Sequence, residues 1–190
     1  MRLLLPFLLL AAASPSQAAP SAEGDVAIAG NVAGLCILGP PSRAAIDLGQ
    51  LAATSGSRTG RIAALPAQTI TLPGSFCNFA GTSVSIQAEA LVGNDAGTLQ
   101  PGFARAVNYT STVGVWAATA PLVTTAAAAD GGSPAASGSG GAHPEPKITD
   151  LVLTLSNFTV PSDAILVSGL YAGRVTITLG PAVGGQTPGD

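Results

Sequence analysis

The stretch DLVLTLSNFTV at residues 150–160 decides the fold class of this 190-residue chain. Its apolar side chains recur at every second position, which puts Leu151, Leu153 and Leu155 on one face of an extended segment. A period of two residues is typical of a β-strand with one buried face. Similar alternation is found at residues 24–32, 68–72, 82–90 and 170–179. The sequence therefore predicts an all-β protein.

The composition agrees with this prediction and excludes two other classes. Charged residues make up 9% of the chain, against about 25% in an ordinary soluble domain. The chain has too few charged side chains for the polar faces of long amphipathic helices. A net charge of −3 provides no basic face, so we expect no nucleic-acid partner.

Shorter β-rich segments complete the expected set at residues 35–38, 45–48, 76–79, 103–118 and 164–167. The segment 103–118 is longer than the others, and we expect a hairpin or a bulge in it near Gly114. About seven to nine short strands at this spacing are typical of an immunoglobulin-like β-sandwich. We assign the sandwich to residues 34–179.

Two regions lack a strand pattern. Residues 126–147 are rich in Ala, Gly, Ser and Pro, and we expect them to form an exposed low-complexity loop within the domain. Residues 180–190 are rich in Gly and Pro and are expected to form a flexible tail.

The first residues have the features of a secretory signal peptide. Arg2 precedes an apolar run at residues 3–13, and the small residues of Ser16-Gln17-Ala18 form a cleavage signal. The apolar run is too short to cross a membrane core, which needs about 20 residues. We therefore expect residues 1–18 to direct export through the Sec route and to be removed, which leaves residues 19–33 as an N-terminal arm.

Export would permit a disulfide between the two cysteines, Cys36 and Cys77. Such a bond would close a loop of about 40 residues and stabilise the fold by about 4 kcal/mol. Two free thiols and a metal pair are the alternatives. A metal site needs further ligands, and His143 lies in a Pro-flanked linker. We expect no metal and no cofactor.

The sequence gives little support for catalysis. With a single histidine, a Ser-His-Asp or Cys-His arrangement is not expected, and the acidic residues lie mostly at turns, loops and termini. We expect no enzyme and no catalytic residue. The aromatic residues Trp116, Tyr109 and Tyr171 are expected in the core, with a sugar-binding surface as the alternative.

Several of these segments together resemble the spore coat protein U family, the subunits of archaic chaperone–usher pili. The resemblance rests on four features. They are an alternating arm that runs into a first cysteine, a short strand that ends in Leu-Gly, a second cysteine after a β-rich segment, and a Gly-x-Tyr before the last strand. In this chain they are Gly24–Ile28 with Asn31-Val32 and Cys36, Ile46–Gln50, Thr69–Leu72 before Cys77, and Gly169–Leu179. The low-complexity loop and the tail are not hallmarks of the family.

The resemblance implies a pilin-type sandwich that is incomplete and is completed by strand donation. The N-terminal arm of one subunit would fill the groove of the next by β-strand addition and build an open filament. The expected donor-strand residues are Val26, Ile28, Gly30 and Val32. The expected partners are other pilus subunits, a periplasmic chaperone and an outer-membrane usher.

We therefore expect a structural subunit of an extracellular pilus, fimbria or surface coat, which passes through the periplasm to the cell surface. The rival hypothesis is a monomeric secreted β-sandwich that acts as a binding module or adhesin. In that case residues 24–32 would be an ordinary first strand of their own domain.

Overall fold

The computed structural model describes residues 21–132 and 135–182, so the expected signal peptide at 1–18 lies outside the described residues. The chain divides into two compact units, Met1–Val32 and Ala33–Asp190, and each is described by itself. The second unit is all-β, as the sequence predicts, and its described part has only two short 3-10 turns.

Ten strands are described in the second unit. They are β1 (Cys36–Ile37), β2 (Gln68–Cys77), β3 (Thr82–Gly93), β4 (Phe103–Ala104), β5 (Ala106–Gly114), β6 (Leu122–Thr124), β7 (Ala136–Ser139), β8 (Lys147–Thr159), β9 (Ile165–Leu166) and β10 (Tyr171–Pro181). The strands pair in the order β1-β2-β8-β5-β3-β10, with β6 on β5 and β7 on β3. All these pairs are antiparallel, and β4 and β9 form a separate parallel pair.

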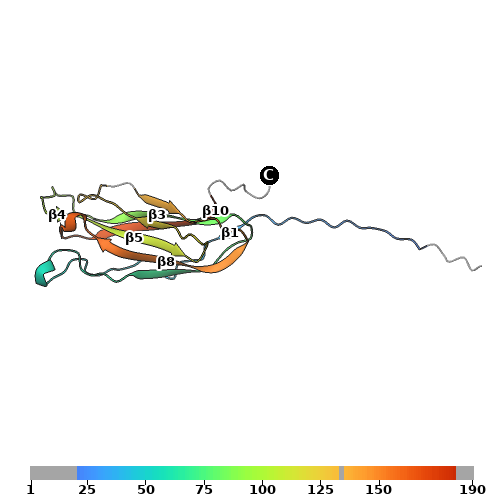
Figure 1. Cartoon of the computed structure of the whole chain (residues 1–190), viewed down its shortest axis with the longest axis horizontal. Coiled ribbons are helices and arrows are strands. Elements are labelled where there is room, and N and C mark those ends of the chain that lie inside the picture. Colours follow the sequence, from blue (N-terminus) through green and yellow to red (C-terminus); the bar gives the residue numbers. More distant parts are fainter. Residues whose placement is uncertain (1–20, 133–134, 183–190) are drawn as a thin grey trace, which may run out of the picture. The chain divides into compact units, whose positions relative to one another are not determined.

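The strands lie in two layers, with β2 and β8 in one and β3 and β10 in the other (Figure 1). Strand β5 joins the layers, because it pairs with β3 at Ala106 and Val107 and with β8 from Asn108 onward. The main core lies between the layers. Its large side chains include Trp116, Leu151 and Ile86, which are at most 2% exposed.

A second, smaller core cluster contains Val107, Val160 and Leu166. Two loops are joined on the surface by an ion pair in which Arg58 Nη2 lies 2.7 Å from Asp163 Oδ1. The hydrogen bond from Arg58 lowers the pKa of the Asp163 carboxyl below its ordinary value. The pair fixes the short turns Gly56–Arg58 and Pro161–Asp163 against each other.

The prediction that residues 126–147 form only a loop is wrong, because β7 lies within them and pairs with β3. The small residues that made this segment look like a linker are what allow the strand to fit. A Cβ on Gly138 would lie 3.0 Å from the carbonyl oxygen of Leu122, so β7 approaches β6 too closely for a side chain there. His143 also forms a β-bridge with Thr82.

Three other segments differ from the sequence prediction or refine it. Residues 24–32 and 45–48 form no strand. The long segment 103–118 divides into β4 and β5, and β5 ends at Gly114 as expected. The chain reverses there because Val115 adopts a left-handed conformation with φ of 67°. The last strand extends to Pro181, and residues 183–190 of the expected tail lie outside the described residues.

Candidate functional site

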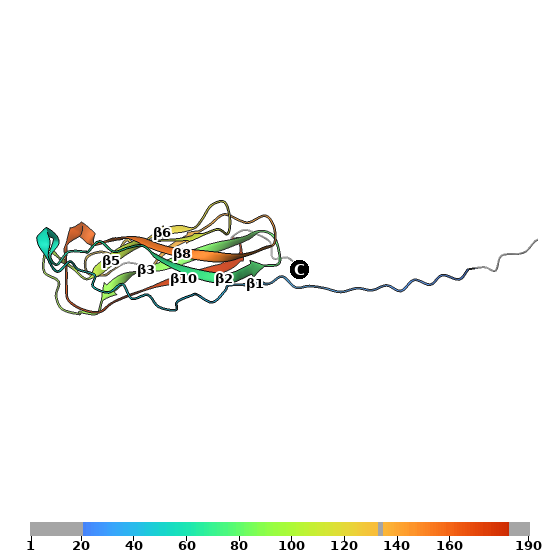
Figure 2. The ribbon, with the colours of Figure 1, turned by 90° about the horizontal axis from the view of Figure 1, so that it is seen from below.

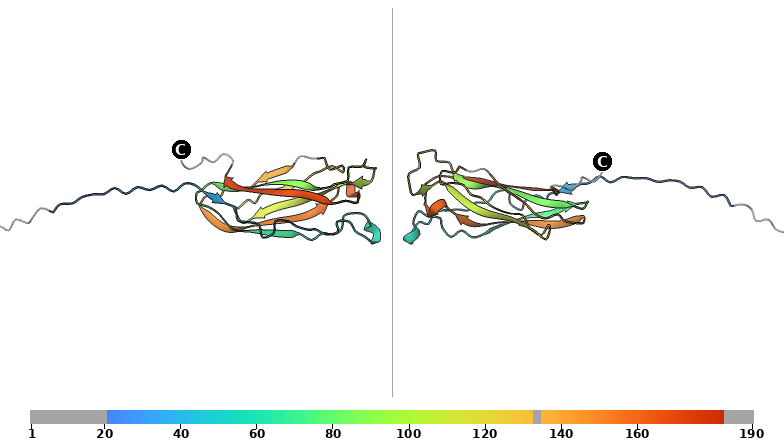
Figure 3. Two further views of the ribbon diagram at one scale, coloured as in Figure 1. Left: turned by 180° about the vertical axis from the view of Figure 1, so that it is seen from behind. Right: turned by 45° about the horizontal axis from the view of Figure 1, so that its top comes forward.

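The last strand, β10, has one edge without a strand partner in the described part of the chain. Its other edge pairs with β3 along almost its whole length, from Tyr171 opposite Gly93 to Pro181 opposite Thr82. Figure 3 (left) shows β10 in red at the surface of the domain, and the chain that follows β1 runs below it. An edge of this kind presents backbone N–H and C=O groups that can pair with another strand.

The segment that faces this edge, residues 38–48, belongs to the other layer. It is held to β2 by a few bonds: the Ser42 amide donates to the Thr71 carbonyl over 2.7 Å, and the Arg43 guanidinium donates to the Thr69 carbonyl over 2.7 Å. No hydrogen bond joins it to β10 among the described residues. The two layers are therefore not closed along this side.

A groove of about 690 Å³ lies between the segment 38–48 and β10. In Figure 2, β10 and β2 run along the same side of the domain. Apolar side chains from both layers line the groove, namely Ile70 and Leu72 of β2, Leu153 and Leu155 of β8, and Val175 and Ile177 of β10. The groove thus opens directly onto the hydrophobic core.

The burial of the two strands of the β3–β10 layer shows the effect of this opening. On β3 the inward side chains of Val84 and Ile86 are 1% and 2% exposed. On β10 the corresponding side chains, Val175, Ile177 and Leu179, are only half-buried, although they alternate with exposed residues as an inward face should. The core face of β10 is therefore incompletely covered.

Tyr109 of β5 lies at the base of the groove and is 3% exposed. Its hydroxyl donates to the carbonyl oxygens of Glu89, over 2.7 Å, and of Arg174, over 3.3 Å. Burial raises the pKa of Tyr109 to about 12, and the Glu89 carboxylate adds to the rise. The side chain thus links β5 to both strands of the opposite layer.

A second hollow, of about 480 Å³, continues the groove past the start of β10. Ile46, Leu48, Leu91 and Tyr171 line both hollows. The Tyr171 hydroxyl donates to the Val167 carbonyl over 2.8 Å, and burial raises the pKa of this phenol. The Gly-x-Tyr sequence therefore places an aromatic side chain in the wall of the groove.

The first unit, described by itself, contains the four residues expected to donate a strand. Its described residues 21–32 form no helix or strand. Val26, Ile28 and Val32 are 85%, 94% and 85% exposed, and a Cβ at Gly30 would meet no atom within 4 Å. Three large aliphatic side chains at alternate positions are thus exposed to water. Burial of each would lower the free energy by about 1.5–3 kcal/mol.

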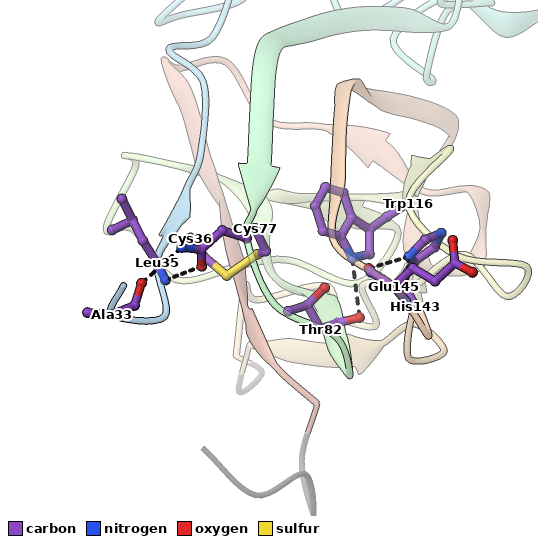
Figure 4. Close-up of a disulfide and its surroundings, with 9 residues drawn as sticks. Ala33, Leu35, Cys36, Cys77, Thr82, Trp116, His143 and Glu145 are labelled. Carbon is purple, nitrogen blue, oxygen red and sulfur yellow. Dashed lines mark hydrogen bonds between the residues drawn. A yellow bond between two sulfur atoms is a disulfide. The ribbon is translucent and has the colours of Figure 1, made fainter. Parts of the chain in front are cut away.

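The predicted disulfide between Cys36 and Cys77 is present and joins β1 to the end of β2 (Figure 4). The S–S distance is 1.98 Å and the Cα atoms are 4.1 Å apart. The next residue, Asn78, holds the chain that leads into β1: its Oδ1 accepts from the Leu35 amide over 2.6 Å, and its Nδ2 donates to the Ala33 carbonyl over 2.9 Å. The start of the domain is thus fixed beside β2.

Of the other candidate residues, Trp116 belongs to the core and His143 lies at its margin. Trp116 is 1% exposed and donates through Nε1 to the Thr82 carbonyl over 3.2 Å, so it cannot offer a face to a sugar. The His143 ring lies tilted by 58° to that of Trp116, with ring centroids 6.3 Å apart, and its Nδ1 lies 2.8 Å from the Glu145 carbonyl oxygen (Figure 4). The described residues contain no group of three or more His, Cys, Asp or Glu side chains that could hold a metal ion. They also contain no helix long and apolar enough to cross a membrane.

Comparisons with known proteins identify no relative: no family model, no curated protein and no solved structure matches the chain.

The sequence pointed to the disulfide, and the resemblance implied an incomplete sandwich with a groove, but neither indicated which residues line the groove or what Asn78 holds. The alternation at residues 170–179 predicts a strand with one apolar face, and it carries no sign of whether that face is covered. Asn78 follows a cysteine in an otherwise ordinary turn. Only the arrangement of β10 and the segment 38–48 in space shows that the groove is open.

Proposed function

We propose that this protein is a structural subunit of an extracellular fibre, assembled by donation of the N-terminal arm of one copy to the groove of the next. The observation that carries the proposal is the open apolar groove beside the free edge of β10, in a chain whose arm leaves three alternating aliphatic side chains in water. One chain thus contains both a site that lacks a strand and a segment with the pattern of that strand.

On this proposal the domain is an immunoglobulin-like sandwich that lacks its last strand. An added strand would pair with the free edge of β10 and cover Val175 and Ile177 with its own apolar side chains. The dimensions agree, because residues 24–32 extend over about 30 Å and the eleven residues of β10 over about 36 Å. Gly30 of the arm would then lie where the groove leaves no room for a side chain.

Arm and groove are different surfaces of one chain, so the contact is head-to-tail and generates an open filament. Before assembly, the uncovered edge and groove would be prone to aggregation. A periplasmic chaperone and an outer-membrane usher are the partners that would protect the subunit and deliver it to the cell surface. The disulfide is in keeping with an oxidising compartment of this kind.

Deletion of residues 19–33 tests the proposal. Intact protein should form a ladder of oligomers that resist denaturant, and the deleted protein should form none while keeping its disulfide-bonded domain in complex with its chaperone. Intact protein that remains monomeric without a chaperone, and unfolds when the arm is deleted, would instead show that the arm completes its own domain. That result would favour the secreted monomeric binding module.

A further inference from the structure

Three apolar residues form a row on the outer face of the β1-β2-β8 layer. Ile37 lies opposite Phe76, and Phe76 lies opposite Ile148, so the three side chains are neighbours across the strands. Ile37 is 45% exposed, Ile148 is 73% exposed and Phe76 is half-buried. The neighbouring residue Cys77 points into the core and is 1% exposed, which places the row on the outside.

The row carries no charge, although the outer face of an antiparallel sheet is ordinarily polar. The two charged residues nearest to Ile148 on β8 are engaged elsewhere. Lys147 Nζ donates to the carbonyl oxygens of Val115, over 2.7 Å, and Trp116, over 2.6 Å. The Asp150 carboxylate accepts from the Gly74 amide over 2.8 Å. An apolar strip is therefore left bare at this end of the layer.

The same end of the domain fixes the root of the arm. Asn78 bonds to Ala33 and Leu35 through its side chain, and its backbone amide donates to the Leu35 carbonyl over 3.0 Å. A Cβ on Gly34 would lie 3.2 Å from the ring of Phe79, so this ring covers the chain between the two bonded residues. The part of the chain that these contacts fix to β2 thus begins at Ala33.

This anchoring limits where a second copy can lie if it binds the arm. Four residues lie between Val32 and Ile37, so the two are at most about 18 Å apart along an extended chain. A copy that holds the arm up to Val32 must therefore lie against the end of the domain that carries the row.

We propose that the row Ile37, Phe76 and Ile148 is the surface on which the arm-binding copy of this chain rests. The inference depends on the proposed function, and it adds a second contact between copies besides the inserted strand. The second contact would fix the angle between successive copies, which an inserted arm alone would leave variable.

The direction in which the arm pairs with β10 identifies the surface of the arm-binding copy that the row would contact. An arm antiparallel to β10 would end beside the start of that strand, because Val32 is the C-terminal end of the donated segment. The start of β10 is preceded by Leu170, which is 78% exposed. The row of one copy would then meet the loop at Leu170 in the next.

The test compares Ile148→Ser with Leu122→Ser. Leu122 is 63% exposed on β6, at the far edge of the same layer, and serves as the matched control. Purified two-copy species linked by an inserted arm are measured by small-angle X-ray scattering. We expect Ile148→Ser to broaden the distance distribution and raise the radius of gyration, and Leu122→Ser to match the unmodified protein. Leu170→Ser in the arm-binding copy should give the same broadening and is the second variant if Ile148→Ser fails to fold.

The results distinguish a failure of the row as a contact from a failure of the proposed function. If the Ile148→Ser and Leu170→Ser dimers scatter like the Leu122→Ser control, the row is not a contact and the inference fails, while an intact ladder leaves the proposed function standing. If the unmodified protein gives no ladder, the proposed function fails and the inference fails with it. A ladder lost only in Ile148→Ser, with an unchanged melting temperature, supports the row as a contact that assembly requires.

Discussion

Ile28→Ala in the arm should separate assembly from folding. The side chain is 94% exposed, so its truncation removes no contact within the chain, and the free energy of unfolding of the monomer should change by no more than about 0.5 kcal/mol. In the groove of another copy the same side chain would be buried. Removal of three methylene-sized groups at about 0.8 kcal/mol each, less the side-chain entropy that burial costs, weakens binding by about 2 kcal/mol.

A loss of this size corresponds to about a 30-fold rise in the dissociation constant between copies. Sedimentation equilibrium over a range of concentrations measures that constant, and chemical denaturation of dilute protein measures the stability of the monomer. Asn31→Ala is the matched control, because Asn31 lies in the other phase of the alternation and should face away from the groove. Equal effects of the two substitutions, or a monomer destabilised by more than about 1 kcal/mol by Ile28→Ala, would contradict burial of Ile28 in the groove of another copy.

Three further predictions concern the domain. Replacing Cys36 and Cys77 together by Ala should lower the melting temperature by about 5–15 °C, since loss of such a disulfide costs about 2–4 kcal/mol; an unchanged calorimetric melting temperature would contradict this. The free energy of unfolding should fall as the pH rises from about 10 towards 12, because Tyr109 loses its proton at a lower pH in the unfolded state than in the folded state. Tyr109→Phe should make this dependence on pH weaker. Denaturation at a series of pH values that gives the same dependence for both proteins would contradict the prediction. Ile177→Ser, in the groove wall, should weaken assembly measured by sedimentation far more than Thr178→Ser on the opposite face of β10, and equal losses would exclude the groove as the binding site.

Alternation in the sequence predicted most of the strands but not the state of their faces. The segment 150–160 became part of the long strand β8, where Leu151 is fully buried and Leu153 is 7% exposed because both lie in the main core between the layers. The segment 170–179 has an equally regular pattern, yet Val175 and Ile177 remain half-buried. Periodicity reports which side of a strand is apolar, whereas burial depends on which strands lie opposite.

The segments whose secondary structure the sequence predicted wrongly depend on neighbours that are distant in the sequence. Residues 136–139 (Ala-Ser-Gly-Ser) read as a linker, but they form β7, which pairs with β3, and a side chain at Gly138 would clash with Leu122 and Val123 of β6. The arm at 24–32 has the pattern of a strand and forms none by itself, because a strand needs a partner for its backbone hydrogen bonds. In both cases the deciding factor is a neighbour distant in the sequence.

The scarcity of charge, at 9% of the residues, has a consequence for the free edge of β10. Charged side chains are a common device against unwanted pairing of sheet edges. On β10 the only charged residue is Arg174, so the edge has little protection from another strand. This is a liability in a solitary protein and suits a subunit that accepts a strand from another copy.

Intermolecular cross-linking tests strand donation most directly. Cys36 and Cys77 are bonded to each other, so an introduced cysteine would be the only free thiol of its chain. One variant carries the cysteine in the arm, at Ile28, and the other carries it in the groove, at Val175, Ile177 or Leu179. Mixed and oxidised, the two variants should form a covalent dimer that the Asn31→Cys variant does not form. A chain with both Ile28→Cys and a groove cysteine that cross-links only within itself, at every concentration, would show that the arm fills its own groove and would contradict assembly by donation.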